Sequence, residues 1–171
     1  MKKIVSGVNN LPLVQCINAQ LGKYLILCDC TEITDEASES NQGKSYSYYG
    51  EEFDGKPTLD QVKSVILAHI NSQIDERIIS GFVWEGMNIW LSTENQFNYK
   101  AAFDLAVMSE GSNLPVTFKF GTTEVPVYHT FTTIEELQDF YTKAMAYINT
   151  VLSDGWQTKD SFDWSVYEEL L

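Results

Sequence analysis

The stretch that decides the fold is Ser80-Gly-Phe-Val-Trp-Glu-Gly-Met-Asn-Ile-Trp-Leu-Ser92, which lies between two segments with helical spacing of apolar residues. It reads as a tight β-hairpin with its turn at Glu85-Gly86. Around it stand three copies of one motif, a threonine followed three residues later by glutamine or glutamate: Thr58–Gln61, Thr93–Gln96 and Thr133–Glu136. In such a capping box the threonine side chain caps the helix, and the Gln or Glu side chain reaches back to the threonine N–H. The motifs therefore predict helices that begin at these threonines.

Apolar residues after each threonine recur at steps of three and four, which predicts three amphipathic helices. The third runs from Ile134 to about Leu152 and ends at Asp154-Gly155, because glycine suits the left-handed position after a helix. The residues expected on the buried stripes are Leu59, Val62, Val65, Ile66, His69, Ile70 and Ile74 in the first helix, Phe97, Ala101, Leu105 and Met108 in the second, and Leu137, Phe140, Tyr141, Ala144, Ile148 and Val151 in the third.

Alternation along a strand predicts which side chains of the 80–92 hairpin face the helices. Phe82 and Trp84 share one face of the first strand, and Ile89 and Leu91 share one face of the second. Trp90 then points the other way, where it is a candidate contact residue. The alternative is that all these aromatics anchor the small sheet to the helices.

Two further strand pairs are expected, one on each side of this unit. Residues 116–120 and 125–131 form the later pair, with Pro126 suited only to a sheet edge or to a strand's first residues. Residues 11–18 and 23–33 form an N-terminal hairpin, which has to pack on something because a lone hairpin is marginal in water.

The predicted fold class is α+β: three helices with two short β-hairpins, plus an N-terminal β-hairpin on a flexible connection. Residues 1–33 are the attachment hairpin, and residues 34–57 are an acidic, tyrosine-containing linker. Residues 58–153 are the helix-hairpin-helix-hairpin-helix domain, and residues 154–171 are an aromatic, acidic tail.

The formal net charge of −13 bears on the partners of the chain. A surface this negative repels phosphate backbones, so neither nucleic acid nor anionic lipid is an expected partner. The acidity is explained by a well-solvated surface, or alternatively by a docking face for a basic protein.

Cysteine usage and hydropathy indicate a chain made in the cytoplasm of the cell that produces it. Cys28 and Cys30 are one residue apart on an expected strand, so they pair poorly with each other, and the odd count with Cys16 favours reduced thiols. We expect no secretory signal and no membrane insertion, because the longest apolar run is far too short.

Motifs for catalysis are not found in the sequence. The two histidines are His69, expected as a satisfied core or boundary residue, and His129, which could meet a carboxylate near the third helix. No catalytic cysteine or serine signature, phosphate-binding glycine loop or zinc-type Cys/His spacing occurs. We therefore expect no enzyme, no cofactor and no metal.

Aromatic residues remain as candidates for partner binding. In the tail, Trp164, Tyr167 and Leu171 have the spacing of a short groove-binding helix, although such a tail more often covers the protein's own core. The candidate partner-binding residues are Tyr46, Tyr48, Trp90, Trp156, Phe162, Trp164 and Tyr167.

The runs at 55–63 and 79–97 resemble a domain of unknown function in Bacteroides-type phage and prophage proteins. The shared pattern is a helix, a G-F-x-W-x-G hairpin ending in a W-L step, a second helix, a strand pair and a third helix. It covers residues 55–153 and leaves out the N-terminal hairpin and the tail.

The resemblance implies a phage or prophage structural protein, a tail- or tail-fibre-associated virion component that acts through contacts with other tail proteins and with copies of itself. It carries over no catalytic residue. Deletion of residues 1–33 or 156–171 is then expected to abolish incorporation into virions while the middle domain stays folded. Two alternatives stay open: a tail-fibre assembly chaperone absent from the mature virion, and a module that binds glycans or small ligands through Trp84 and Trp90.

Overall fold

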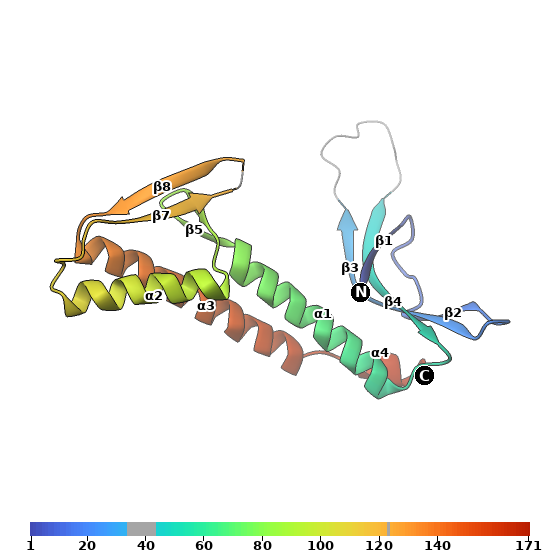
Figure 1. Cartoon of the computed structure of the whole chain (residues 1–171). Helices are drawn as coiled ribbons and strands as arrows, with labels where there is room; N and C mark the ends of the chain where they lie inside the picture. Colours follow the sequence, from blue (N-terminus) through green and yellow to red (C-terminus); the bar gives the residue numbers. More distant parts are fainter. Residues whose placement is uncertain (34–43, 123) are drawn as a thin grey trace. The chain divides into compact units, whose positions relative to one another are not determined.

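The computed structural model describes residues 1–33, 44–122 and 124–171, which form two compact units (Figure 1). Unit 1 consists of Met1–Ile70 together with Ser161–Leu171, and unit 2 consists of Asn71–Asp160. Each unit combines helix with antiparallel strands, so the predicted α+β class is confirmed. The boundary between the units falls within one helix, α1 (Leu59–Ser80).

Unit 1 is built on a four-stranded antiparallel sheet with strand order β1-β4-β3-β2 (Figure 1). Its strands are β1 (Lys2–Ser6), β2 (Val14–Asn18), β3 (Lys23–Ile33) and β4 (Ser45–Asp54). The predicted N-terminal hairpin is present as β2 and β3, and it packs within this sheet.

The linker predicted over residues 34–57 is wrong for its second half, because 45–54 form β4, an inner strand hydrogen-bonded to both β1 and β3. Three tyrosines and Phe53 favour a strand here, whereas Gly50, the two glutamates and Asp54 disfavour one. Pairing on both sides outweighs the unfavourable residues. The first half of the predicted linker, 34–43, lies outside the described residues.

Unit 2 contains two small hairpins and two helices besides the end of α1. The strands are β5 (Phe82–Trp84), β6 (Met87–Ile89), β7 (Val116–Gly121) and β8 (Pro126–Phe131), and the helices are α2 (Thr93–Met108) and α3 (Ile134–Asp160). Both predicted hairpins are confirmed. Glu85 and Gly86 both have positive φ, 49° and 76°, as a two-residue type I′ turn requires.

The core of unit 2 is an aromatic cluster around Phe140 of α3, which is fully buried. Rings from β5, α2, β7 and β8 surround it, with centroids 5.1 to 6.4 Å away. These rings belong to Phe82, Trp84, Tyr99, Phe120 and Phe131. As predicted, Phe82 and Trp84 point inward while Trp90 is 55% exposed.

The end of α3 differs from the prediction, because the helix continues through Gly155 to Asp160. A Cβ at position 155 would meet the side chain of Ile74 on α1, with Cγ1 at 2.7 Å. Gly155 therefore serves close helix–helix approach instead of ending the helix.

Two of the three threonines predicted to cap helices do so in the structure. The Oγ1 atom of Thr58 accepts from the N–H of Gln61, whose side chain accepts from the N–H of Thr58 at 2.8 Å. Thr133 likewise accepts from Glu136 N–H. For α2 the cap is Ser92, one residue earlier than predicted, and its Oγ accepts from the N–H of Asn95.

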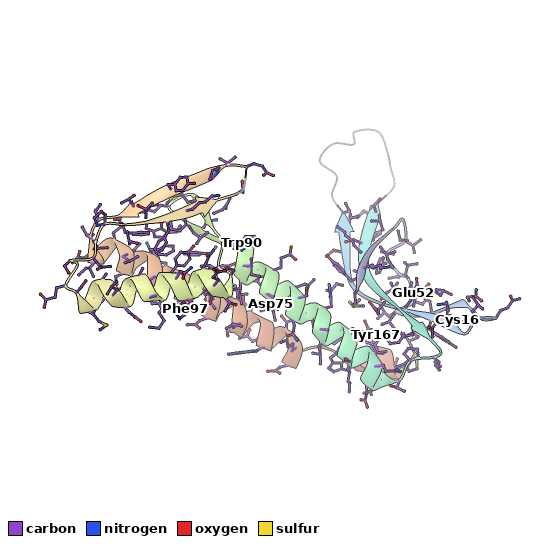
Figure 2. The ribbon with its side chains drawn as sticks, in the orientation of Figure 1. Cys16, Glu52, Asp75, Trp90, Phe97 and Tyr167 are labelled. Carbon is purple, nitrogen blue, oxygen red and sulfur yellow. The ribbon has the colours of Figure 1, made fainter. Side chains whose placement is uncertain are left out.

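The tail ends in the short helix α4 (Ser165–Glu168), which belongs to unit 1. Tyr167 is buried there, and its hydroxyl donates a 2.7 Å hydrogen bond to the carbonyl of Leu27 on β3. The alternative that the tail covers the protein's own core is thus confirmed for Tyr167, which Figure 2 labels.

Candidate functional site

The exposed side of α2 is the largest departure from the buried stripes expected from the sequence. Phe97, Leu105 and Met108 are 71%, 53% and 82% exposed, and Ala101 is exposed with them. These four residues, which we call the α2 face, lie on one side of the helix because they are spaced by four, four and three residues. Phe97 is labelled in Figure 2.

The buried side of α2 is formed by different residues. Tyr99 and Ala106 are buried, and Tyr99 packs edge-on against Phe140 with ring centroids 5.1 Å apart. Phe103 stacks on Tyr141 of α3 at 5.0 Å. Both sides of α2 are apolar, so periodicity alone could not tell the two apart.

Acidic residues accompany the α2 face. At about 100° per residue, Glu94 and Asp104 lie on the same side of the helix as Phe97 and Leu105. Glu94 is in the first turn of α2, where negative charge is favourable, and Asp104 forms an ion pair with Lys100. The surface therefore combines apolar side chains with carboxylates.

The predicted partner-binding residues divide into three groups in the structure. Trp90 and Trp156 are 55% and 60% exposed, and their contact role stays a prediction. Tyr46, Phe162 and Trp164 are half-buried. Tyr48 and Tyr167 are 1% and 2% exposed, so these two are core residues and the prediction is wrong for them.

Half-buried aromatics of the tail are held within unit 1. The rings of Phe162 and Trp164 lie 4.3 Å apart, and the ammonium group of Lys63 on α1 lies 5.7 Å from the Trp164 ring. Their immediate role is to fix the tail against the start of α1.

A hollow of about 530 Å³ in unit 2 contains the exposed Trp90. Polar side chains line it from β6 and from the β7–β8 hairpin, including Asn88, Lys119, Thr122 and Glu124. An aromatic ring beside amide, ammonium and carboxylate groups is a surface that a polar small ligand could contact.

His129 has a structural partner, as the sequence suggested. Its Nε2 atom lies 2.9 Å from Oε1 of Glu136, whose other oxygen accepts from the N–H of Thr132 at 3.3 Å. Glu136 thus links β8 to the start of α3, and this structural role explains its position next to His129.

Unit 1 brings together a thiol and a carboxylate from consecutive residues of β3 with an imidazole from α1. The sulfur of Cys28, a carboxylate oxygen of Asp29 and a ring nitrogen of His69 all lie within 4.8 Å of one another. His69 Nε2 is 3.0 Å from Oδ2 of Asp29, and the His69 ring lies 4.2 Å from that of Tyr49. His69 is only 8% exposed, which confirms the expected satisfied core or boundary role.

The sequence has no Cys/His spacing of the zinc type, and sequence reasoning had no signal for this cluster. Cys28 and Asp29 come from β3, whereas His69 lies 40 residues later on α1. No short spacing links them, so only the fold brings them together.

This cluster is unsuited to nucleophilic catalysis. Burial, followed by the nearby charge of Asp29, raises the pKa of Cys28 to about 12. A reactive thiol needs a lowered pKa, because the thiolate is the nucleophile. A thiol that stays protonated at neutral pH is a poor nucleophile.

Comparison with known proteins adds the family to this picture. The family model of a domain of unknown function, DUF4376, matches residues 61–170. The chain belongs to this family. The DUF4376 match covers well over half of the chain, starting within α1 and extending through the tail that the sequence resemblance had left out. No curated protein and no solved structure matches the chain.

The DUF4376 region includes the α2 face, both hairpins of unit 2, α4 and His69, but not Cys28 or Asp29. Among the residues that the structure describes, no helix is long and apolar enough to cross a membrane.

Proposed function

We propose that this protein is a structural component that works through protein–protein contacts and has no catalytic activity, and that the α2 face is its contact surface. The observation that carries the proposal is the exposure of Phe97, Leu105 and Met108 side by side on one helix. Adjacent large apolar side chains on a surface are typical of interaction sites. The face is separate from the core, which Tyr99 and Ala106 complete from the other side of α2.

The partner proposed for this face is a protein segment with an amphipathic helix that carries Lys or Arg beside its apolar stripe. Apolar side chains of such a helix would cover Phe97 and Met108, and its cations would lie near Glu94 and Asp104. The net charge of −13 favours a basic partner over a second copy of the chain, since two copies repel each other.

The setting that we propose is a phage or prophage particle, where the chain would be a tail- or tail-fibre-associated virion component made in the host cytoplasm. The support for this setting is the sequence resemblance of residues 55–153 to phage and prophage proteins. Two exposed tryptophans, Trp90 and Trp156, would add secondary contacts with neighbouring tail proteins.

The test compares two helix variants in the phage or prophage that encodes the chain. Phe97→Ser with Leu105→Ser removes two side chains of the α2 face. Val107→Ser is the matched control, because Val107 is 50% exposed on the same helix but points about 160° away from Leu105. Each purified variant should keep the helix content of the wild type by circular dichroism.

Mass spectrometry of purified particles then gives the outcome. Wild type and Val107→Ser should be present in equal amounts, and the double variant should be reduced at least tenfold. Equal incorporation of the double variant would overturn the assignment of the α2 face. Absence of the wild-type chain from particles, with loss of tail fibres when it is deleted, would instead establish the chaperone alternative.

A second candidate function, polar-ligand binding, is favoured by the hollow at Trp90. In that case a glycan array should detect binding, and a bound ligand should change tryptophan fluorescence in the wild type but not after Trp90→Phe. No binding on the array and no change in fluorescence would remove this candidate.

A further inference from the structure

The sheet of unit 1 contains an irregularity at the point where its most polar buried cluster lies. Pairing of β3 with β4 shifts register between Cys28 and Thr31, which marks a β-bulge. Asp29, within the bulge, has φ of 53°, in the left-handed region that a residue other than glycine adopts only at some cost. Bulges often redirect a side chain at a functional site.

The bulge changes where two consecutive side chains point. In a regular strand Cys28 and Asp29 would face opposite sides of the sheet. Here the sulfur of Cys28 and the carboxylate of Asp29 lie within 4.8 Å of each other and of a nitrogen of His69. The bulge thus gathers a thiol, a carboxylate and an imidazole in one place.

We propose that Cys28, Asp29 and His69 form a binding site for a divalent metal ion of the zinc class. The ligands would be Sγ of Cys28, a carboxylate oxygen of Asp29 and a ring nitrogen of His69. This inference is independent of the function proposed for the α2 face.

Distances in the cluster agree with such a site. Around tetrahedral zinc, with bonds of about 2.0 to 2.3 Å, neighbouring ligand atoms are roughly 3.3 to 3.6 Å apart. His69 Nε2 and Asp29 Oδ2 are already 3.0 Å apart, and the largest separation in the cluster is at most 4.8 Å. Closure around an ion therefore needs side-chain shifts of about 1 Å, judged from those ideal separations.

Ligand chemistry selects the class of ion. Calcium and magnesium take oxygen ligands almost exclusively, so a thiolate and an imidazole argue against both. Cysteine, histidine and carboxylate together are the donors used by zinc. Three protein ligands leave a fourth position, and the thioether of Met1 lies close by, with Sδ 3.6 Å from Sγ of Cys28.

Access and rigidity also agree with binding. Cys28 and His69 are 3% and 8% exposed, so their rotamers are fixed by packing, whereas Asp29 is exposed and opens the cluster to solvent. Tyr49 supports the His69 ring from one side. Because Cys28 and His69 are fixed and Asp29 is open to solvent, an ion can reach the cluster without unfolding of the unit.

Cobalt(II) is the probe for the test, used on the full chain after treatment with a chelator and kept reduced. A cysteine-ligated tetrahedral cobalt ion gives a thiolate-to-cobalt charge-transfer band and strong visible bands. The expected result is one Co²⁺ per chain, displaced by one equivalent of Zn²⁺ and unaffected by excess Mg²⁺ or Ca²⁺.

Variants assign the ligands. Cys28→Ser should abolish the charge-transfer band, and His69→Gln should weaken zinc affinity at least tenfold. Asp29→Asn should also weaken it at least tenfold, while asparagine keeps the left-handed backbone. Cys30→Ser and Cys16→Ser are the matched controls, because both thiols are exposed and lie outside the cluster, and both should bind as the wild type does.

The inference is overturned if the wild type gives no charge-transfer band, or if the band follows Cys16 or Cys30. It is equally overturned if Asp29→Asn and His69→Gln bind zinc as tightly as the wild type. These two variants decide the question even where Cys28→Ser fails to fold, since circular dichroism reports folding separately. Zinc should raise the melting temperature of the wild type and leave that of His69→Gln unchanged.

Discussion

The indole N–H of Trp84 donates a 3.1 Å hydrogen bond to Oδ2 of Asp139, which ties the β5–β6 hairpin to α3. The same carboxylate oxygen accepts from the ammonium group of Lys143, one helical turn later, at 2.8 Å. Trp84 is 3% exposed and its ring packs edge-on against Phe140 at 5.3 Å. A surface carboxylate thus completes the hydrogen bonding of a core residue.

Asp139→Asn should destabilise unit 2 at neutral pH, with a loss that disappears in acid. The hydrogen bonds from Lys143 and then Trp84 lower the pKa of Asp139 below 3.8. A carboxylate with a lowered folded pKa contributes stability above its unfolded pKa, and this contribution is lost as pH falls through the folded value. Urea unfolding of both proteins at pH 7 and in steps below pH 4 measures the difference.

The control for this prediction is Asp104→Asn, which also breaks a lysine pair one turn away but bonds no indole. It should lower the free energy of unfolding less than Asp139→Asn does at pH 7. Equal losses for the two variants would show that the hydrogen bond from Trp84 to Asp139 does not contribute to stability. Trp84→Phe should lower the free energy of unfolding by roughly 1–3 kcal/mol, because packing and the hydrogen bond to Asp139 are lost.

Gly155→Ala should destabilise the protein, although alanine is normally the better helix residue by about 1 kcal/mol. The new methyl group would overlap Cδ1 and Cγ1 of Ile74, and overpacking of this kind costs about 1–3 kcal/mol. Thermal or urea unfolding gives the sign. In a double-mutant cycle, Ile74→Val should recover part of the loss, and purely additive effects would contradict the proposed contact.

Alkaline pH should reveal the burial of Tyr99, whose pKa is raised from 10.0 to about 12 by burial. A raised folded pKa gives stability that is complete below pH 10 and lost as pH rises toward 12. Tyr99→Phe should remove about 2.7 kcal/mol of this loss, the value that corresponds to a pKa shift of about two units. Tyr128→Phe is the control, because that ring is 68% exposed and should follow the wild type. An alkaline loss of stability that is as large in Tyr99→Phe as in the wild type would refute the assignment.

The start of α2 offers a test at single-residue resolution. Ser92→Ala should cost about 1 kcal/mol, the usual value for removal of a capping hydroxyl. Thr93→Ala, one residue on, should cost almost nothing, because Ser92 makes the capping hydrogen bond to Asn95 N–H. Guanidinium unfolding at neutral pH distinguishes the two variants. A larger loss of stability for Thr93→Ala than for Ser92→Ala would show that Thr93 is the cap, as predicted from the sequence.

Local signals in the sequence were sufficient for the first hairpin of unit 2 and for two helix starts, one in each unit. The Glu85-Gly86 turn, the alternation of Phe82 and Trp84, and the caps at Thr58 and Thr133 all depend on residues close in the chain. Such features follow from turn geometry and side-chain hydrogen bonds, which a short segment determines by itself.

Other features depend on contacts between distant segments and were not predictable in the same way. The strand at 45–54 is stabilised by β1 and β3. The α2 face is exposed because the opposite side of the helix, with Tyr99, packs on α3. The role of Gly155 inside α3 follows only from its contact with Ile74. The Cys28–Asp29–His69 cluster is the extreme case, since it needs a bulge in β3 and a helix 40 residues away.

Unit 1 is discontinuous, and this has a consequence for how the chain is made. Its core contains Tyr167, which bonds to the Leu27 carbonyl, whereas unit 2 ends at Asp160. Because domains tend to fold as they leave the ribosome, every residue of unit 2 is available before the first strands can complete their core. Strands β1 to β4 therefore wait for α4, which is synthesised only after the whole of unit 2, and in this interval the nascent sheet is exposed to proteases.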